Sequence, residues 1–188
     1  MSKHLEPGTT IPDFELPDEA GELHRLSELQ GDNVLVLHLS RGEHCPRERQ
    51  HHHELLRFHE FCSVAFTELV SILPNTLHET YRMKISTGAR WTFLADEQLE
   101  IQQHFDINEY TDTHHDNACV PHTLILSPGL VVEKVYVGYW FWGRPSNDLL
   151  WADIGAVLAR TKSDFDPTTP EARAEWEASL RGIAPAHA

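Results

Sequence analysis

The chain has 188 residues, 40% of them hydrophobic, which is typical of one globular domain with a buried core. Its 29 acidic and 15 basic side chains give a formal net charge of -14. Because nucleic acids and anionic membranes are bound by clustered Lys and Arg, this charge argues against both as partners. The first residues lack the apolar stretch of a secretory signal, and no segment has about 20 consecutive apolar residues. We therefore expect a cytoplasmic protein whose partners are small molecules or other proteins.

Strand and helix patterns alternate along most of the chain. In chain order, the predicted elements are a strand at 33–40, a helix from 45 or 46 to about 61, a strand at 63–74, helices at 75–86 and 96–107, a hairpin at 120–138 around Pro128 and Gly129, and a helix at 145–162. Short strand-like pieces around a glycine turn come before these elements, whose core order is βαβαββα, and a capped helix at 169–182 follows them. We predict one α/β domain over residues 1–164 and a helical tail over 165–188.

Cys45 lies where the first strand passes into the first long helix. The chain's three cysteines are an odd number without the spacing of a disulfide framework, so they are predicted to be free thiols. A thiol at a helix start lies near unpaired backbone N–H groups and the positive end of the helix dipole, which favour the thiolate. Arg41, Arg47 and Arg49 add positive charge nearby. Cys45 is therefore the predicted reactive thiol.

Five short motifs occur in an order that is specific for one fold. They are PDF at 12–14, RGxxCP at 41–46, FLAD at 93–96, VPxT at 120–123 and PG at 128–129. With them, residues 7–160 resemble the alkyl hydroperoxide reductase and thiol-specific antioxidant family, the peroxiredoxin-like branch of the thioredoxin superfamily. The resemblance implies a mixed central sheet flanked by helices and no cofactor. It also implies that Cys45 attacks a peroxide, becomes a sulfenic acid and is reduced by another thiol.

The sequence departs from the family pattern around the cysteine. The family carries Thr or Ser three residues before it and Pro seven residues before it, where this chain has Gly42 and His38. The family arginine that orients the peroxide aligns near Pro121, a proline that is typical of thioredoxins and that we expect in the cis form. Glu48 replaces the second cysteine of a dithiol CxxC motif.

These missing donors predict a slow peroxidase, because one lost donor to a developing charge can cost about 100-fold in rate. The side chains that could take over are His38, His44, Arg41 and His122. Of these, we name Arg41 and His44, with Pro121, as the candidate catalytic residues beside Cys45.

The two other cysteines differ in their expected roles. Cys62 lies 17 residues beyond Cys45, about 25 Å along a continuous helix, whereas a disulfide needs α-carbons within about 7 Å. Cys62 is therefore predicted to pack in the core. In the family's fold the Val-Pro pair lies beside the reactive cysteine, so Cys119 is a candidate resolving thiol. The alternative is a bystander without a redox role.

Histidines and a carboxylate near Cys45 raise the alternative of a metal-binding or redox-sensing module without catalysis. On the predicted helix, Cys45, Glu48 and His52 share one face. The candidate ligands are Cys45, Glu48, His52, His114, His115 and His122. No recognised zinc spacing is present. The other interpretation is that the triple histidine at 51–53 is an exposed helix surface, with His38 a hydrogen-bonded core residue.

Five aromatic residues cluster at 136–142, directly after the hairpin. Adjacent rings on one segment cannot all point inward, so some should face a pocket or a second copy of the chain. A homodimer is the predicted alternative to core packing. The remaining expected partners are a small peroxide or thiol substrate and an external thiol reductant.

Overall fold

The computed structural model describes residues 5–112, 114, 118–139, 142–162, 170 and 174. Its elements are β1 (Glu15–Pro17), β2 (Leu23–Arg25), α1 (Leu26–Gln30), β3 (Val34–Leu39), α2 (Pro46–Cys62), the 3-10 helix η1 (Ser63–Ala65), β4 (Thr67–Leu73), α3 (Leu77–Thr87), β5 (Thr92–Ala95), α4 (Glu100–Phe105), β6 (His122–Ser127), β7 (Val131–Val137) and α5 (Asn147–Thr161). None of the helices in this part of the chain is long and apolar enough to cross a bilayer.

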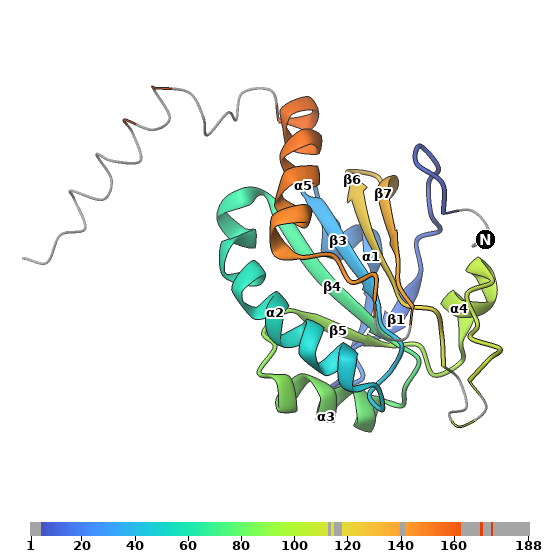
Figure 1. Ribbon diagram of the computed structural model, residues 1–188. Coiled ribbons are helices and arrows are strands. Elements are labelled where there is room, and N and C mark those ends of the chain that lie inside the picture. Colours follow the sequence, from blue (N-terminus) through green and yellow to red (C-terminus); the bar gives the residue numbers. More distant parts are fainter. Residues whose placement is uncertain are drawn as a thin grey trace, which may run out of the picture.

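A mixed sheet with the order β5-β4-β3-β6-β7 forms the centre of the fold (Figure 1). β3 pairs in parallel with β4 and antiparallel with β6, while β6 and β7 form the predicted hairpin. Every residue of β3 is buried, as expected for an apolar run in the middle of a sheet. This arrangement confirms the predicted thioredoxin-like fold.

Helices cover both faces of the sheet. α2, α3 and α5 pack on one face through a core cluster that includes Phe58, Met83 and Ile154. α1, α4 and the N-terminal segment cover the other face through a second cluster that includes Leu26 and Phe105. Successive β3 side chains alternate between the two clusters because the side-chain period of a strand is two residues. His38 therefore faces α2, between Leu37 and Leu39 on the opposite face.

The structure adds three elements, β5, α1 and η1, and shortens two, since the strand expected over 63–74 begins at Thr67. β5 and α1 were not predicted, because segments of four and five residues are too short to show a clear period. The helix expected over 96–107 begins at Glu100. Asp96 still caps it, since its carboxylate accepts hydrogen bonds from the backbone N–H groups of Glu100 (2.7 Å) and Ile101 (3.0 Å).

The N-terminal strand extension is present as the antiparallel pair β1 and β2. The predicted tail at 165–188 and its helix at 169–182 lie outside the described residues, apart from residues 170 and 174. The division into a domain and a tail therefore stays a prediction.

Candidate active site

Cys45 is the N-cap residue of α2, with an extended backbone (φ -85°, ψ 116°), and Pro46 occupies the first turn. Its backbone N–H donates to the carbonyl of Gly42 (3.2 Å), and its carbonyl accepts from the N–H of Glu48 (3.1 Å). The residue is 3% exposed. Proline favours a first helical turn because it lacks the N–H that the helix would leave unpaired. The sequence therefore placed the cysteine correctly at the strand-to-helix junction.

The tight loop before Cys45 depends on Gly42, whose φ of +122° is a conformation that side chains rarely adopt. A Cβ at this position would also lie 3.1 Å from the His44 ring. The family's Thr or Ser could not take this position without moving the loop. The glycine at residue 42 thus suits the loop conformation of this chain.

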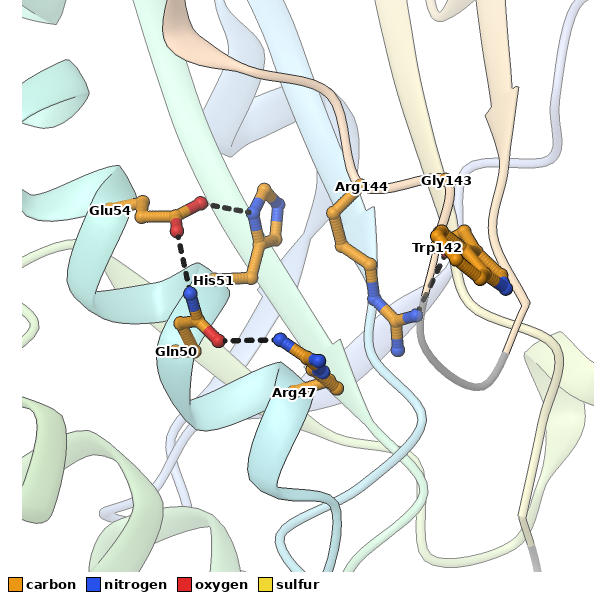
Figure 2. Close-up of a pocket in the computed structure, with 7 residues that line it drawn as sticks. All are labelled: Arg47, Gln50, His51, Glu54, Trp142, Gly143 and Arg144. Atoms are coloured by element: carbon orange, nitrogen blue, oxygen red, sulfur yellow. Dashed lines mark hydrogen bonds and ion pairs between the residues drawn. The ribbon is translucent and has the colours of Figure 1, made fainter.

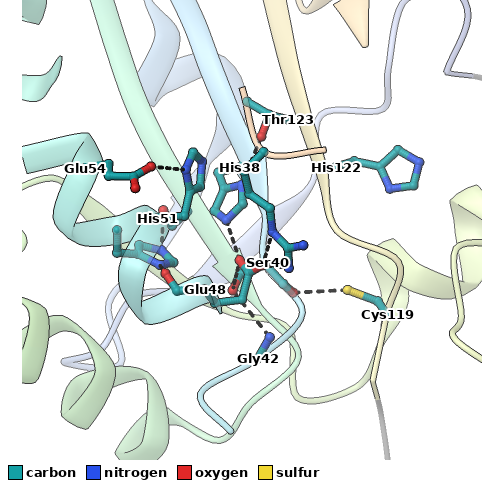
Figure 3. A network of polar contacts seen from close by, with 12 residues as sticks. His38, Ser40, Gly42, Glu48, His51, Glu54, Cys119, His122 and Thr123 are labelled. Carbon is teal, nitrogen blue, oxygen red and sulfur yellow. Dashed lines mark hydrogen bonds and ion pairs between the residues drawn. The ribbon is translucent and has the colours of Figure 1, made fainter. Parts of the chain in front are cut away.

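Glu48, one turn into α2, is fully buried at the centre of a polar network (Figure 3). Its carboxylate accepts hydrogen bonds from the Nε2 atom of His38 (2.7 Å) and the hydroxyl of Ser40 (3.0 Å). Arg144 donates to the same carboxylate through Nε (2.8 Å) and through Nη2. Burial alone raises the pKa of Glu48, but His38 and Arg144 outweigh it and hold that pKa well below its usual range. Glu48 is thus an ionised carboxylate in the core.

His38 joins this network to the sheet. Its Nδ1 atom lies 3.1 Å from the Thr123 hydroxyl on β6, and its Nε2 atom contacts Glu48. Because an ionised carboxylate only accepts, Nε2 carries a proton and donates it to the hydrogen bond with Glu48. The predicted role of His38 as a hydrogen-bonded core residue is confirmed.

A second chain of hydrogen bonds passes through His52. Trp91 donates to the Ser71 hydroxyl (2.9 Å), which lies 3.2 Å from Nε2 of His52. The Nδ1 atom of His52 in turn donates to the Glu48 carbonyl (2.7 Å). Burial, with His38 close by, lowers the pKa of His52 to about 3. His52 is therefore neutral at ordinary pH.

The triple histidine is not an exposed surface, as one interpretation of the sequence held. His51 and His52 are buried, and only the third ring, that of His53, is exposed. His51 and His52 fall on the side of α2 that packs inward, where their ring centroids lie 4.9 Å and 5.2 Å from that of His38.

Among the described residues, the predicted metal ligands are only partly brought together. Glu48 and His52 share a cluster with His38, with candidate ligand atoms all within 4.8 Å of one another. These atoms already serve the hydrogen bonds given above, and the Arg144 guanidinium lies against the same carboxylate. A cation here would break those bonds and meet a like charge, so the donor set fits a hydrogen-bonded network better than a metal centre. Cys45, His114 and His122 join no such cluster in the described part, and His115 lies outside it.

Arg41 and His44 belong to the loop between β3 and α2. Arg41 forms an ion pair with Asp112 (2.5 Å), and both side chains are almost fully buried, at 7% and 3% exposure. The Arg41 charge is therefore neutralised locally and holds the loop against the segment before β6. The ring of His44 packs over Gly42 and is partly buried.

Pro121 is in the trans form, as is every peptide bond in the described part of the chain, so the predicted cis proline is wrong. The backbone on both sides of the bond is held by neighbouring segments. The N–H of Val120 donates to the Ile107 carbonyl (2.8 Å), and the N–H of Gly138 donates to the Pro121 carbonyl (2.7 Å). Nδ1 of His122 donates to the Val120 carbonyl (2.7 Å), and burial lowers the pKa of that histidine.

Cys62 and Cys119 are both free, buried thiols. Cys62 packs in the cluster beneath α2, as predicted, and burial raises its pKa to about 12. Cys119 belongs to the cluster on the opposite face of the sheet and donates to the Ser40 carbonyl (3.1 Å). Burial, together with the Glu48 charge, raises the pKa of Cys119 well above its usual range. Both environments disfavour a thiolate.

Sequence analysis missed Arg144, the buried partner of Glu48. The two residues are 96 positions apart, and no local period connects them. The only signal was an arginine directly after the aromatic cluster at 136–142. Within that cluster, Tyr139 and Trp142 are exposed, at 56% and 73%, so not all of its rings pack in the core.

Comparisons with known proteins agree with this geometry. The model of the AhpC/TSA family matches residues 7–135. Among solved structures, peroxidoxin BcpB from Mycobacterium tuberculosis is similar over 87% of this chain and 100% of its own, with 20% identity and a TM-score of 0.68. Reduced Prx3 from Vibrio vulnificus in complex with hydrogen peroxide is similar over 79% and 98%, with 18% identity and a TM-score of 0.70. A yeast mitochondrial 1-Cys peroxiredoxin is similar over 88% and 84%, with 11% identity and a TM-score of 0.70. No curated protein matches the sequence.

Proposed function

This chain belongs to the AhpC/TSA family and is a thiol-dependent, peroxiredoxin-like oxidoreductase, and we propose that Cys45 is its redox-active thiol. The observation that carries the assignment is the position of Cys45 as N-cap of α2, directly after the central strand and inside the segment that matches the family. The helix N-terminus offers N–H groups and a positive dipole end to a thiolate. The other two thiols are buried where burial opposes ionisation.

In the proposed first step, the Cys45 thiolate attacks one oxygen of a hydroperoxide. The O–O bond breaks, the cysteine becomes a sulfenic acid, and the other oxygen leaves as an alcohol or water after taking up a proton. The network around Glu48 supports this step by positioning. It ties the first turn of α2 to β3 through His38 and to the segment after β7 through Arg144.

We propose that this reaction is slow compared with that of dedicated peroxiredoxins. Gly42 and Pro121 have no side-chain donors to stabilise the departing oxygen. Three of the side chains that could replace them are engaged elsewhere. Arg41 pairs with Asp112, His38 contacts Glu48 and Thr123, and His122 bonds a backbone carbonyl.

We propose an external thiol as the reductant of oxidised Cys45. Cys119 stays the candidate internal alternative. Its hydrogen bond to Ser40 and its place in the core on the face away from α2 both favour the external route. A small hydroperoxide is the proposed oxidising substrate. A cytoplasmic location and a homodimer stay predictions.

The test is rapid-mixing oxidation of the full chain with hydrogen peroxide, followed by trapping of sulfenic acid with dimedone and mass spectrometry. We expect a single adduct on Cys45, none in Cys45→Ser, and a rate at least about 100-fold below that of a dedicated peroxiredoxin measured alongside. An adduct on Cys62 instead would refute the assignment of Cys45. A rate equal to the reference enzyme would refute the proposed slow step. A disulfide between Cys45 and Cys119 in the oxidised protein would refute the external reductant.

A further inference from the structure

A hollow of about 190 Å³ lies between the first two turns of α2 and the segment at 142–144 (Figure 2). It is separate from the Glu48 carboxylate, although Arg144 takes part in both. Its walls are mostly polar or charged side chains. The lining residues are Arg47, Gln50, His51, Glu54, Trp142, Gly143 and Arg144.

His51 is the unusual member of this lining. The residue is 2% exposed, and both of its ring nitrogens are buried without a hydrogen-bond partner. The Glu54 carboxylate lies 3.9 Å from Nδ1, too far for a hydrogen bond. A buried polar group left unpaired costs about 1–3 kcal/mol, so such groups normally have a partner.

The ring of His51 is neutral. Burial, followed by the effect of His38, lowers its pKa well below the usual value, although the nearby Glu48 carboxylate raises it. A neutral imidazole carries one N–H donor and one acceptor nitrogen. His51 can therefore bond a ligand that offers either an oxygen or an N–H group.

Charges of both signs border the hollow. Arg47 and Arg144 contribute guanidinium groups, and the Arg144 charge is partly balanced from behind by Glu48. Glu54 contributes a carboxylate. Gln50 connects the positive and negative groups. Its amide oxygen accepts a hydrogen bond from Arg47 (2.9 Å), and its amide nitrogen donates one to Glu54 (3.2 Å). A ligand with one carboxylate and one ammonium group would match this pattern better than a simple anion.

The hollow lies close to the reactive cysteine along the helix. Cys45 and His51 are six residues apart, which is about 9 Å of helix at 1.5 Å per residue. Glu48, on the turn between them, is bonded to Arg144 in the wall. A thiol attached to a group seated in the hollow would have to reach about 9 Å along the helix, which takes a linker of about seven bonds.

From these observations we propose that the hollow binds the α-amino-acid end of a small thiol that reduces oxidised Cys45. The α-carboxylate would face Arg47 and the ammonium group would face Glu54, with His51 donating to a carboxylate oxygen. About 190 Å³ corresponds to roughly six water molecules at 30 Å³ each, which suits a free amino acid. The reductant role rests on the proposed function, whereas the amino-acid site does not.

The chemistry of the reduction is balanced by two molecules of the thiol. The first attacks the sulfur of the Cys45 sulfenic acid, forming a mixed disulfide and releasing the hydroxyl group with one proton as water. The second attacks the mixed disulfide, releasing the small-molecule disulfide and restoring the Cys45 thiol. The two thiols are oxidised and the cysteine is reduced by two electrons.

Binding is tested without any redox step by calorimetry of the reduced protein with L-serine, which carries a hydroxyl in place of the thiol of L-cysteine. We expect saturable binding that weakens at least 10-fold in Glu54→Gln and in His51→Leu. The apolar leucine also removes the unpaired nitrogens, so this variant should fold. The matched control is Glu60→Gln, which changes an exposed carboxylate on the same helix and should bind like the unchanged chain. No saturable binding, or equal weakening in the control, would overturn the site.

The reductant role is tested by single-turnover reduction of preformed Cys45 sulfenic acid. γ-Glutamylcysteine, whose thiol lies seven bonds from its free α-amino-acid carbon, should give a saturating rate, while cysteamine, which lacks the carboxylate, should give a linear one. Glu54→Gln should remove the saturation. Serine binding with a linear γ-glutamylcysteine rate would overturn the reductant role and leave the amino-acid site standing. A protein that forms no sulfenic acid would contradict the proposed function, and the serine result would still decide the site.

Discussion

The buried ring of His52 should make the protein less stable as the pH falls from about 7 to about 5. Its pKa is about 3 in the folded chain, against about 6.5 in an unfolded one. At a pH between these two pKa values, the ring is protonated in the unfolded state and neutral in the folded state. The free energy of unfolding therefore decreases as the pH falls through 6.5. Over the two units from pH 7 to 5, this one ring should remove about 2 kcal/mol.

His52→Asn tests this value, because asparagine retains a side-chain N–H that can reach the Glu48 carbonyl but does not titrate in this range. The variant should be less stable at about pH 7, since Ser71 loses its contact with Nε2. Between about pH 7 and about pH 5, the free energy of unfolding of this variant should decrease by about 2 kcal/mol less than that of the unchanged chain.

Urea unfolding followed by circular dichroism at both pH values measures the difference. His78→Asn is the control, because it replaces an exposed ring on α3 and should reproduce the loss of the unchanged chain. An equal loss in the unchanged chain and in His52→Asn would refute the reasoning.

Three further predictions concern the Glu48 ion pair, the close approach at Gly138 and the reactivity of the thiols. Glu48→Gln leaves a buried guanidinium without its counter-ion, so urea unfolding should show a loss of about 3–5 kcal/mol, and an unchanged midpoint would contradict the buried pair. Gly138→Ala places a Cβ 2.7 Å from the ring of the proline before β6, so it should cost about 1–3 kcal/mol. Gly155→Ala, on a helix with nothing within 4 Å, should instead stabilise the chain, and equal effects would show that the close approach is unimportant. Iodoacetamide at neutral pH should label Cys62, whose pKa is raised to about 12, more slowly than Cys45, as mass spectrometry of the labelled peptides would show.

Local patterns in the sequence determined most of the fold. The apolar run of β3 identified the central strand, and Pro46 marked the first turn of α2 behind Cys45. Pro128 and Gly129 marked the hairpin between β6 and β7. These signals are readable because hydrophobic period, capping and turn preference act over only a few residues. The same short range explains why β5, with four residues, was missed.

Only the tertiary structure decided the surroundings of the cysteine. Glu48 could be seen as a departure from a dithiol motif, but its charge partner Arg144 lies 96 residues away and is brought to it by the path of the chain after β7. Cys119 is close to Pro121 in sequence, yet it packs on the face of the sheet away from α2. Such pairings depend on which segments the sheet order brings together, and no local period carries that information. The sequence thus singled out Cys45 as the proposed reactive thiol, whereas the folded chain decided which charges and hydrogen bonds surround that residue.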